Sequence, residues 1–291
     1  MHKAGFVNII GKPNAGKSTL MNALVGEKLS IVTPKAQTTR HRIISILNGE
    51  DYQIVFSDIP GIIDPGYKMQ ECMMAFVDEA FKDADVLIYL VDASERPEAE
   101  HLSPDLIATK IPVILVINKV DQSTQEKIDE NIIKWKKILP NAELIVVSAL
   151  RKFNIDSLTN LIVNLLPESP PYYDKDTLTD RSQRFFVSEI IREKALLLYY
   201  KEIPYCIEID IDEFKEEENI FRISAIIYVV RDSQKVIVIG EGGKSIKRLG
   251  TDARKDIEEF LGKQVFLQLF VKVQKNWRDN VLLLKKFGYI K

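Results

Sequence analysis

The stretch "NIIGKPNAGKSTLMNALVG", residues 8–26, decides the fold of the first half of the chain. A short apolar segment enters a loop that contains Gly11, Gly16, Lys17 and Ser18, and an apolar helical pattern follows it. The spacing is that of the P-loop: glycine, four residues, then Gly-Lys-Ser. Glycines there let successive backbone N–H groups point inward at an anion, and the helix adds the positive end of its dipole. The sequence therefore predicts a phosphate-binding loop, with Lys17 on the β- and γ-phosphates and the Ser18 hydroxyl on Mg²⁺.

Length and composition indicate an ordinary globular protein of two domains. The chain has 291 residues, of which 46% are hydrophobic and 28% charged, and its net charge of −2 favours no class of partner. Residues 231–291, however, hold 14 Lys or Arg against 7 Asp or Glu. This basic end is compatible with an RNA or phosphate surface, and equally with a solvated basic face.

From residue 5 to about residue 166, apolar strands alternate with amphipathic helical patterns. The pattern predicts an α/β domain with a mostly parallel sheet and helices on both faces. The stretch 167–185 is rich in proline and charge, and after it the predicted order is α-β-β-α-α-β. We therefore predict domains at 1–170 and 186–291, joined by a linker at 171–185.

The chain shows no signal peptide, no apolar run of about 20 residues and no cysteine pair with metal-ligand spacing. These features favour the cytoplasm.

The tetrapeptide "NKVD", Asn118 to Asp121, follows an apolar strand. A carboxylate at Asp121 accepts hydrogen bonds from guanine N1–H and the exocyclic amino group, and adenine lacks this pair of donors. Asn118 would brace the neighbouring loops, and the stem of Lys119 would cover the face of the base. "SAL", Ser148 to Leu150, closes another strand and offers backbone N–H groups to guanine O6. The predicted ligand is therefore GTP or GDP.

A second phosphate-side motif, "DIPG", ends a further apolar strand at Asp58 to Gly61. Asp58 would hold Mg²⁺ through a water, and the Gly61 N–H would sense the γ-phosphate. Between this motif and the P-loop lies "KAQTTRHR", in which either Thr38 or Thr39 could supply the switch ligand to Mg²⁺; we favour Thr39.

The predicted nucleotide-binding residues are Gly11, Lys12, Pro13, Asn14, Ala15, Gly16, Lys17, Ser18, Thr19, Asp58, Ile59, Pro60, Gly61, Ile62, Asn118, Lys119, Val120, Asp121, Ser148, Ala149 and Leu150. The predicted Mg²⁺ ligands are Ser18, Thr39 and Asp58, and the first switch comprises Gln37, Thr38, Thr39, Arg40 and His41.

In the second half, Gly240, Glu241, Gly242 and Gly243 lie between two helical patterns. In the predicted element order they match the GxxG loop of a type II KH module, whose glycines let the backbone approach nucleotide phosphates. Lys244, Lys247 and Arg248 follow on the next helix and would neutralise phosphates. Ile237, Ile239 and Ile246 would either line the nucleotide groove or belong to the core. Trp277 and Arg278 would contact RNA, although a packed tryptophan is the favoured interpretation.

The motifs "GKPNAGKS", "QTTRHR", "DIPG", "NKVD" and "SAL", with "LTDRSQRF", "SEIIREK" and the C-terminal module, resemble the Era-type GTPases over nearly the whole chain. The resemblance implies a monomeric GTP-hydrolysing switch that binds the 3′ end of 16S rRNA through its KH domain and assists 30S subunit assembly. It further implies peripheral contact with the inner membrane and no DNA partner. The chain departs from the family at Ile59, where a threonine is usual, and at Glu241, which adds a negative charge to the loop.

Ras-like enzymes place a water-orienting Gln directly after the glycine of "DIPG", and this chain has Ile62 there. We therefore expect slow intrinsic hydrolysis, with Lys17, Thr39 and Gly61 as catalytic groups. By resemblance, Asn14 joins these catalytic groups by binding a K⁺ ion that accelerates the reaction. The alternative is that Asn14 only forms the turn of the loop and binds no ion.

Two alternatives remain open at this point. The chain could be an RNA-binding scaffold that holds GTP without hydrolysing it, or a GTPase whose KH-like module binds a protein or a membrane.

Overall fold

The computed structural model describes residues 1–99, 102 and 104–290, and it divides into two compact units. The first unit comprises residues 1–30, 39–64 and 73–180, and the second comprises residues 31–38, 65–72 and 181–291. Each unit has its own hydrophobic core. Two short segments from the N-terminal half thus cluster with the C-terminal unit. The predicted boundaries at 170 and 185 stay a prediction.

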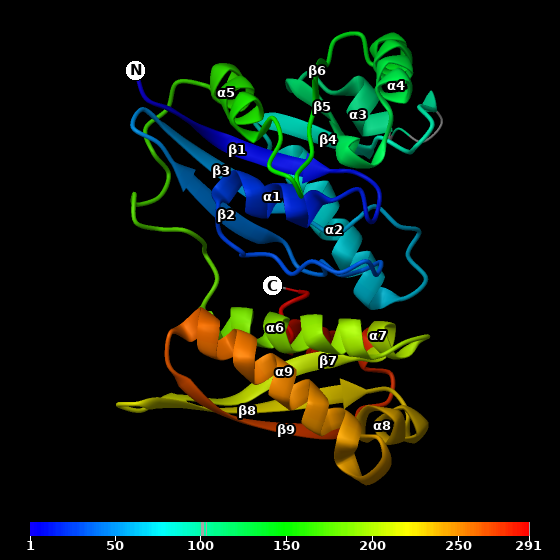
Figure 1. Ribbon diagram of the computed structural model, residues 1–291, viewed down its shortest axis with the longest axis vertical. Coiled ribbons are helices and arrows are strands. Elements are labelled where there is room, and N and C mark those ends of the chain that lie inside the picture. The colour runs from blue at the N-terminus through cyan, green and yellow to red at the C-terminus, as the bar shows by residue number, and fades with distance from the viewer. Residues whose placement is uncertain (100–101, 103, 291) are drawn as a thin grey trace. The chain divides into compact units, whose positions relative to one another are not determined.

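The first unit is built on one six-stranded sheet of order β2-β3-β1-β4-β5-β6, in which only the β2–β3 pair is antiparallel (Figure 1). The strands are β1 (Lys3–Ile10), β2 (Ile43–Asn48), β3 (Tyr52–Asp58), β4 (Val86–Asp92), β5 (Val113–Asn118) and β6 (Glu143–Val146). The mostly parallel sheet confirms the predicted α/β class. The edge strand β2, which begins just after the predicted switch residues, was not recognised in the sequence because its hydrophobic pattern is short.

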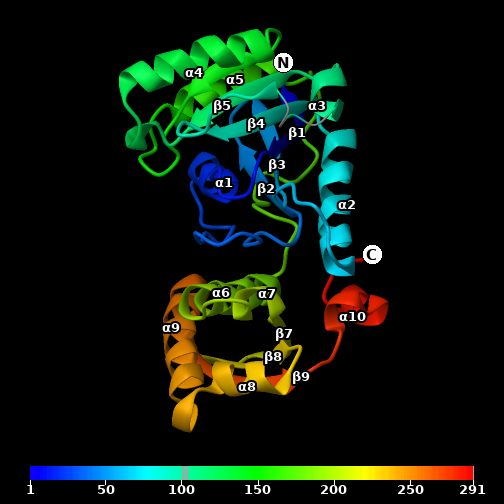
Figure 2. The ribbon, with the colours of Figure 1, turned by 90° about the vertical axis from the view of Figure 1, so that its right-hand side faces the viewer.

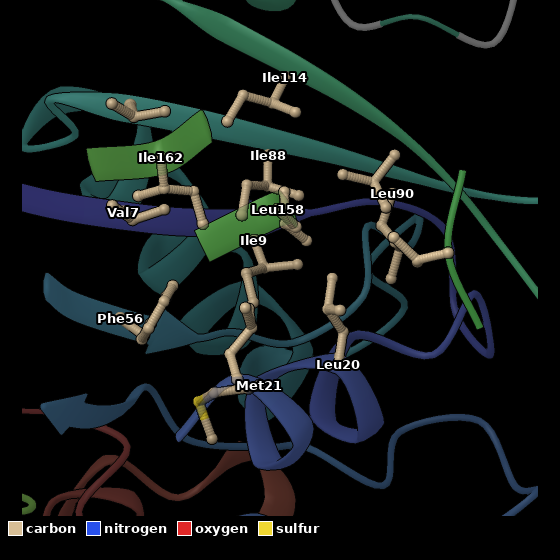
Figure 3. Packing of buried hydrophobic residues seen from close by; sticks show 14 of the residues in the cluster. Val7, Ile9, Leu20, Met21, Phe56, Ile88, Leu90, Ile114, Leu158 and Ile162 are labelled. Atoms are coloured by element: carbon tan, nitrogen blue, oxygen red, sulfur yellow. The ribbon is translucent and has the colours of Figure 1, made fainter. Parts of the chain in front are cut away.

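Helices cover both faces of this sheet, as the nearly continuous hydrophobicity of its central strands requires. The helices are α1 (Lys17–Val25), α2 (Lys68–Lys82), α3 (Pro104–Ala108), α4 (Gln125–Ile138) and α5 (Ile155–Leu165). On one face, Leu20 and Met21 of α1 and Leu158 and Ile162 of α5 pack against strand residues such as Ile9 (Figure 3). On the other face, a second apolar cluster joins α2, α3 and α4 to the sheet. The sheet is therefore the middle of three layers.

Residues 172–179 run along the β2–β3 edge of the first unit. The amide of Ile46 donates to the carbonyl of Leu178 at 2.8 Å, and the Thr179 hydroxyl donates to the carbonyl of Ile44 at 2.7 Å. Gln53 accepts from the amides of Tyr172 and Tyr173. This part of the predicted linker is thus fastened to the first unit by hydrogen bonds.

The C-terminal part of the second unit is a three-stranded sheet with helices packed on one face (Figure 2). Its main elements are α6 (Gln183–Leu198), β7 (Glu208–Glu216), β8 (Ile220–Val229), α8 (Asp232–Ile239), α9 (Lys244–Leu261) and β9 (Gln264–Val273). Strand β8 is central, antiparallel to β7 and parallel to β9. This is the predicted α-β-β-α-α-β order, extended by short helices α7 (Ile203–Cys206) and α10 (Val281–Lys286).

Both cysteines are free; Cys206 is buried and Cys72 is half-buried. Within the described part of the chain, no helix has the length and hydrophobicity needed to span a bilayer.

Candidate functional site

The P-loop connects the end of β1 to the start of α1, where backbone geometry makes an anion site. Gly16 caps the helix in the left-handed region, with φ of 101°. A side chain there would collide with its surroundings, because an added Cβ would lie 2.4 Å from the Asn118 Nδ2 atom. Asn14 also has a positive φ, 64°. Glycine at position 16 is therefore required both by the backbone angle and by the close approach of Asn118.

Lys17 is buried at the base of this loop. Its ammonium donates to the carbonyls of Gly11 and Lys12, both at 3.0 Å. Burial lowers the pKa of Lys17 to about 8, although the nearby carboxylate of Asp58 raises it. The phosphates of a bound nucleotide would place negative charge next to this ammonium and favour its charged form. The buried lysine therefore suits a site that binds an anion.

The three predicted Mg²⁺ ligands lie together. The Ser18 hydroxyl is 2.9 Å from the Thr39 hydroxyl, which in turn donates to Asp58 Oδ2 at 3.3 Å. Burial raises the pKa of the Asp58 carboxyl, against the opposing effect of the Ser18 hydroxyl. The other oxygen of this carboxylate, Oδ1, is buried and accepts no hydrogen bond of good geometry from the described residues. An orphaned buried oxygen beside two hydroxyls fits a hydrated Mg²⁺ ion.

The structure distinguishes the two switch threonines left open by the sequence. The Thr38 hydroxyl donates to the Lys35 carbonyl at 2.6 Å and lies 2.7 Å from the Thr33 hydroxyl. It is therefore occupied within its own segment, whereas Thr39 faces Ser18. The geometry favours Thr39 as the switch ligand. Of the other predicted switch residues, Arg40 and His41 are buried, and Gln37 lies 3.4 Å from the Tyr67 hydroxyl.

The loops predicted to hold the base meet at Asn118. Its Nδ2 donates to the Ala15 carbonyl at 2.9 Å, and its Oδ1 accepts from the Ala149 amide at 3.0 Å. One side chain thereby joins the P-loop to the "SAL" loop. The Ser148 hydroxyl donates to Asp121 Oδ1 at 2.5 Å, which places the carboxylate beside the same loop. Leu150 is exposed, and Val120 packs against the apolar cluster.

Asp92, at the end of β4, belongs to this site and was missed by the sequence analysis. It lies 2.7 Å from the Lys119 ammonium, which also donates to the Asn14 carbonyl at 2.7 Å. Although burial alone would raise the pKa of Asp92, hydrogen bonds from Lys119 and Ser94 hold it below its usual value. Asp92 therefore anchors the charged end of Lys119 across the P-loop. Its position at the carboxyl end of a parallel strand was the available signal.

The "DIPG" motif follows β3. Ile59 is fully buried in the apolar cluster on the α2 side of the sheet. An added Cβ on Gly61 would lie 3.0 Å from Pro13, which places this glycine against the P-loop. Ile62 is 41% exposed and has no group that could orient a water. Ile62, directly after the motif, therefore offers no side-chain hydrogen bond to the attacking water.

In the second unit, the predicted GxxG loop connects α8 to α9. Gly240, Gly242 and Gly243 all have positive φ, of 73°, 58° and 77°. At Gly240 an added Cβ would lie 2.6 Å from Ser245 Cβ, whereas Gly242 and Gly243 have nothing within 4 Å of such an atom. The tip of the loop, including exposed Glu241, is thus open to a ligand, and its N-terminal end is packed.

A groove of about 410 Å³ lies between α9 and the edge strand β9. Its walls combine apolar side chains with two cationic ones, and the lining residues are Ile246, Lys247, Gly250, Thr251, Arg254, Val265, Phe266, Leu267 and Leu269. Phe266 is 45% exposed. Aliphatic and aromatic walls with cations at the rim suit bases and phosphates.

The predicted RNA residues divide between two places. Lys247 and Ile246 line this groove, and Lys244 begins α9 directly after the loop. Arg248 instead lies on the α6 side of α9, where it is 3.8 Å from Asp252. Ile237 is exposed on α8. Arg254 and Phe266 were not predicted as RNA-binding residues, since only the packing of α9 against β9 brings them together in the groove.

The fold and these two sites define a class: a P-loop GTP-binding α/β domain followed by a KH module. The family described as "50S ribosome-binding GTPase" matches residues 6–119, and "KH domain" matches residues 202–278. GTPase Era of Clostridium botulinum (strain Hall) is 44% identical over 292 residues, covering 99% of each chain. GTPase Era of Clostridium kluyveri (strain ATCC 8527) is also 44% identical, covering 99% of this chain and 100% of its own.

Two solved structures are similar over the full length. Era in complex with MgGDPNP and nucleotides 1506–1542 of 16S ribosomal RNA has a TM-score of 0.95 at 38% identity, covering 100% of both chains. A variant of Aquifex aeolicus Era bound to GDP·AlF4⁻ has the same TM-score and identity, covering 99% of this chain and 100% of that one. The chain belongs to the Era GTPase family. It binds GTP and GDP with Mg²⁺ and hydrolyses GTP to GDP and phosphate. The roles of the individual residues stay predictions.

Proposed function

We propose that this GTPase is a molecular switch that binds the single-stranded 3′ end of 16S rRNA through its KH module and assists assembly of the 30S subunit. The observation that carries the proposal is the groove between α9 and β9, in the same unit as an open GxxG loop. It is supported by the similarity of the whole chain to an Era structure that contains a GTP analogue and 16S rRNA. The site of action we propose is the cytoplasm, and peripheral contact with a membrane stays an expectation.

The chemistry of the groove matches single-stranded RNA better than a helical peptide or a lipid. KH modules hold about four nucleotides, with the loop backbone against phosphates and the bases in the groove. Here the open glycines offer the backbone, Lys247 and Arg254 offer positive charge, and Phe266 offers a ring for stacking. Binding should therefore depend on salt, because each neutralised phosphate releases counterions.

RNA affinity tests this proposal directly. The probe is a labelled single-stranded RNA that copies the 3′ tail of small-subunit rRNA, and its anisotropy is read with a non-hydrolysable GTP analogue and with GDP. We expect tighter binding with the GTP analogue, and a loss of about tenfold or more in Gly242→Asp, because the new carboxylate would face phosphates.

Gly242→Asn is the matched control for this variant. Asparagine tolerates a φ of 58° as well as aspartate does and has the same size, but it carries no charge. Equal RNA affinity in both nucleotide states would leave an RNA-binding GTPase without a switch. Absence of RNA binding in either state would favour a protein or membrane partner for the second unit.

We further propose that K⁺, bound near Asn14, accelerates hydrolysis. The exposed Ile62 cannot orient water, so additional positive charge near the γ-phosphate would supplement Lys17 and Mg²⁺ in stabilising the transition state. We expect GTP turnover at least about tenfold faster in K⁺ than in Na⁺ at equal ionic strength. Gly fits the φ of 64° at position 14, so Asn14→Gly should remove the side chain without strain and reduce the K⁺ rate to the Na⁺ rate. Equal rates of the unaltered protein in the two salts would contradict the proposal.

A further inference from the structure

The segment 31–38 precedes Thr39 and belongs to the second compact unit. It is held along α6 by several hydrogen bonds. Glu193 Oε1 accepts from the Val32 amide at 3.1 Å, and Arg192 Nη2 donates to the Thr38 carbonyl at 2.5 Å. Since Thr38 is covalently joined to the predicted Mg²⁺ ligand, the position of this segment must respond to whatever orders Thr39.

Lys35 fastens the same segment to the C-terminal end of α6. Its ammonium donates to the carbonyls of Leu196 and Tyr199 and lies 5.0 Å from the centre of the Tyr200 ring. The last carbonyls of a helix have no partner within the helix and carry the negative end of its dipole. A cation is therefore the appropriate group at this point, and it fixes the backbone of Tyr199.

The side chain of Tyr199 reaches both ends of the GxxG loop. It is 4% exposed, and its hydroxyl donates to the Val238 carbonyl at 2.8 Å and lies 3.4 Å from the Ser245 hydroxyl, which donates to it. Val238 is in the last turn of α8, and Ser245 is in the first turn of α9.

The packed end of the loop depends on the same serine. Gly240 lies so close to Ser245 that a Cβ on Gly240 would be 2.6 Å from the serine Cβ. The distance between the last turn of α8 and the first turn of α9 therefore sets the shape of the loop, and Tyr199 bonds to both turns. Burial raises the pKa of the Tyr199 phenol, so the hydroxyl keeps the proton that it donates.

We propose that Tyr199 is a positioning residue for the RNA-binding loop, and that Lys35 couples it to the switch segment 31–38. This inference rests on the proposed function, because it explains how a nucleotide state at Thr39 would bias RNA affinity at Gly240–Gly243. Nucleotide shifts RNA affinity only through such a differential contact.

Two variants separate the two parts of the proposal. Tyr199→Phe keeps the buried ring and removes only the hydroxyl, so we expect RNA affinity to fall about tenfold in both nucleotide states. Lys35→Met keeps an apolar stem and removes the ammonium, so we expect the ratio of RNA affinities with GTP analogue and GDP to fall towards one. Tyr205→Phe is the matched control, since it removes the same group from a half-buried tyrosine of α7 for which no hydroxyl bond to the loop is found among the described residues. Thermal unfolding verifies that each variant is folded.

A second measurement keeps the inference testable without RNA. Amide hydrogen exchange of Gly242, Gly243 and Lys244 should be faster in Tyr199→Phe than in Tyr205→Phe. In the unaltered protein this exchange should differ between GTP analogue and GDP, and in Lys35→Met the difference should vanish. Unchanged exchange and RNA affinity in Tyr199→Phe would overturn the positioning role. A nucleotide-dependent ratio retained in Lys35→Met would overturn the coupling. If the exchange changes appear while no variant binds the RNA probe, the proposed function fails and the inference about the loop stands.

Discussion

Replacing Asp121 with asparagine is expected to lower the affinity of the protein for GTP by about two orders of magnitude or more. The carboxylate would accept two hydrogen bonds from guanine, and hydrogen bonds to a charged group contribute about 1.5–3 kcal/mol each. An asparagine presents an NH₂ group to the exocyclic amino group of guanine, so two donors would face each other without an acceptor between them. The loss should therefore exceed that of a simple missing contact.

The same substitution should improve binding of xanthosine triphosphate. Xanthine carries a carbonyl where guanine carries the amino group, and the asparagine NH₂ can donate to it. The rest of the base site should persist, because Asn118 still joins Ala15 to Ala149. If Asp121 contacts the base directly, the variant should prefer XTP to GTP. If the substitution only damages the loop, the variant should lose affinity for both nucleotides.

Displacement of a fluorescent GDP by unlabelled GTP and XTP measures both affinities. Asp129→Asn is a suitable control, because it makes the same chemical change on an exposed part of α4, where the carboxylate accepts from Gln125 of the same helix. If Asp121→Asn binds GTP as tightly as the unaltered protein and discriminates against XTP, Asp121 does not read the base.

The nucleotide site was largely predictable from sequence because its chemistry is local. The backbone geometry of a P-loop is encoded in consecutive residues, and the motifs that follow it stand at the carboxyl ends of parallel strands. Asp92 also stands at such an end, but a single aspartate has no spacing to mark it. Its role became visible only through its 2.7 Å pair with Lys119. The sequence favoured Thr39 over Thr38, and the 2.9 Å distance between the Thr39 and Ser18 hydroxyls supports that choice.

The RNA groove was less predictable because it is non-local. The GxxG loop can be recognised in the sequence. The walls of the groove, however, come from α9 and β9, and which residues of β9 face α9 depends on the register of β9 against β8. Strand β9 alternates strictly, with Val265 facing the core and Phe266 outward. That alternation predicts which side chains share a face, but not that the strand borders a groove to which both Val265 and Phe266 contribute. Lys247 and Arg248 are adjacent in sequence, and helical geometry sends them to different sides of α9.

Trp277 is where the structure decides most clearly between two interpretations. The side chain is fully buried, and its indole Nε1 donates to the Cys206 carbonyl at 3.1 Å. Its ring meets Phe287 edge-on, with centroids 5.7 Å apart. The tryptophan therefore belongs to the core that fixes the C-terminal end of the chain onto the KH sheet, as the favoured interpretation had it.

Trp277→Ala should accordingly destabilise the second unit by about 3–5 kcal/mol. The substitution leaves a large cavity and a buried Cys206 carbonyl without its donor. For a unit of this size, the loss corresponds to a fall in Tm of more than about 10 °C for the KH transition. GTP binding should be retained, because the nucleotide site has its own core around Leu20 and Ile9.

Two further variants make this result specific to packing. Trp277→Phe keeps an aromatic ring and should recover much of the stability. Arg278→Ala, in the same turn, should lower the KH transition far less than Trp277→Ala, because, within the described residues, half-buried Arg278 loses only its contact with the Tyr67 ring, 4.4 Å away. Differential scanning calorimetry with saturating GDP separates the two transitions by shifting the first unit upward. A Trp277→Ala protein that melts normally but loses RNA would instead place this side chain in the RNA interface. The complete burial of Trp277 argues for the first result, since a ring with no exposed surface has no free face on which a base could stack.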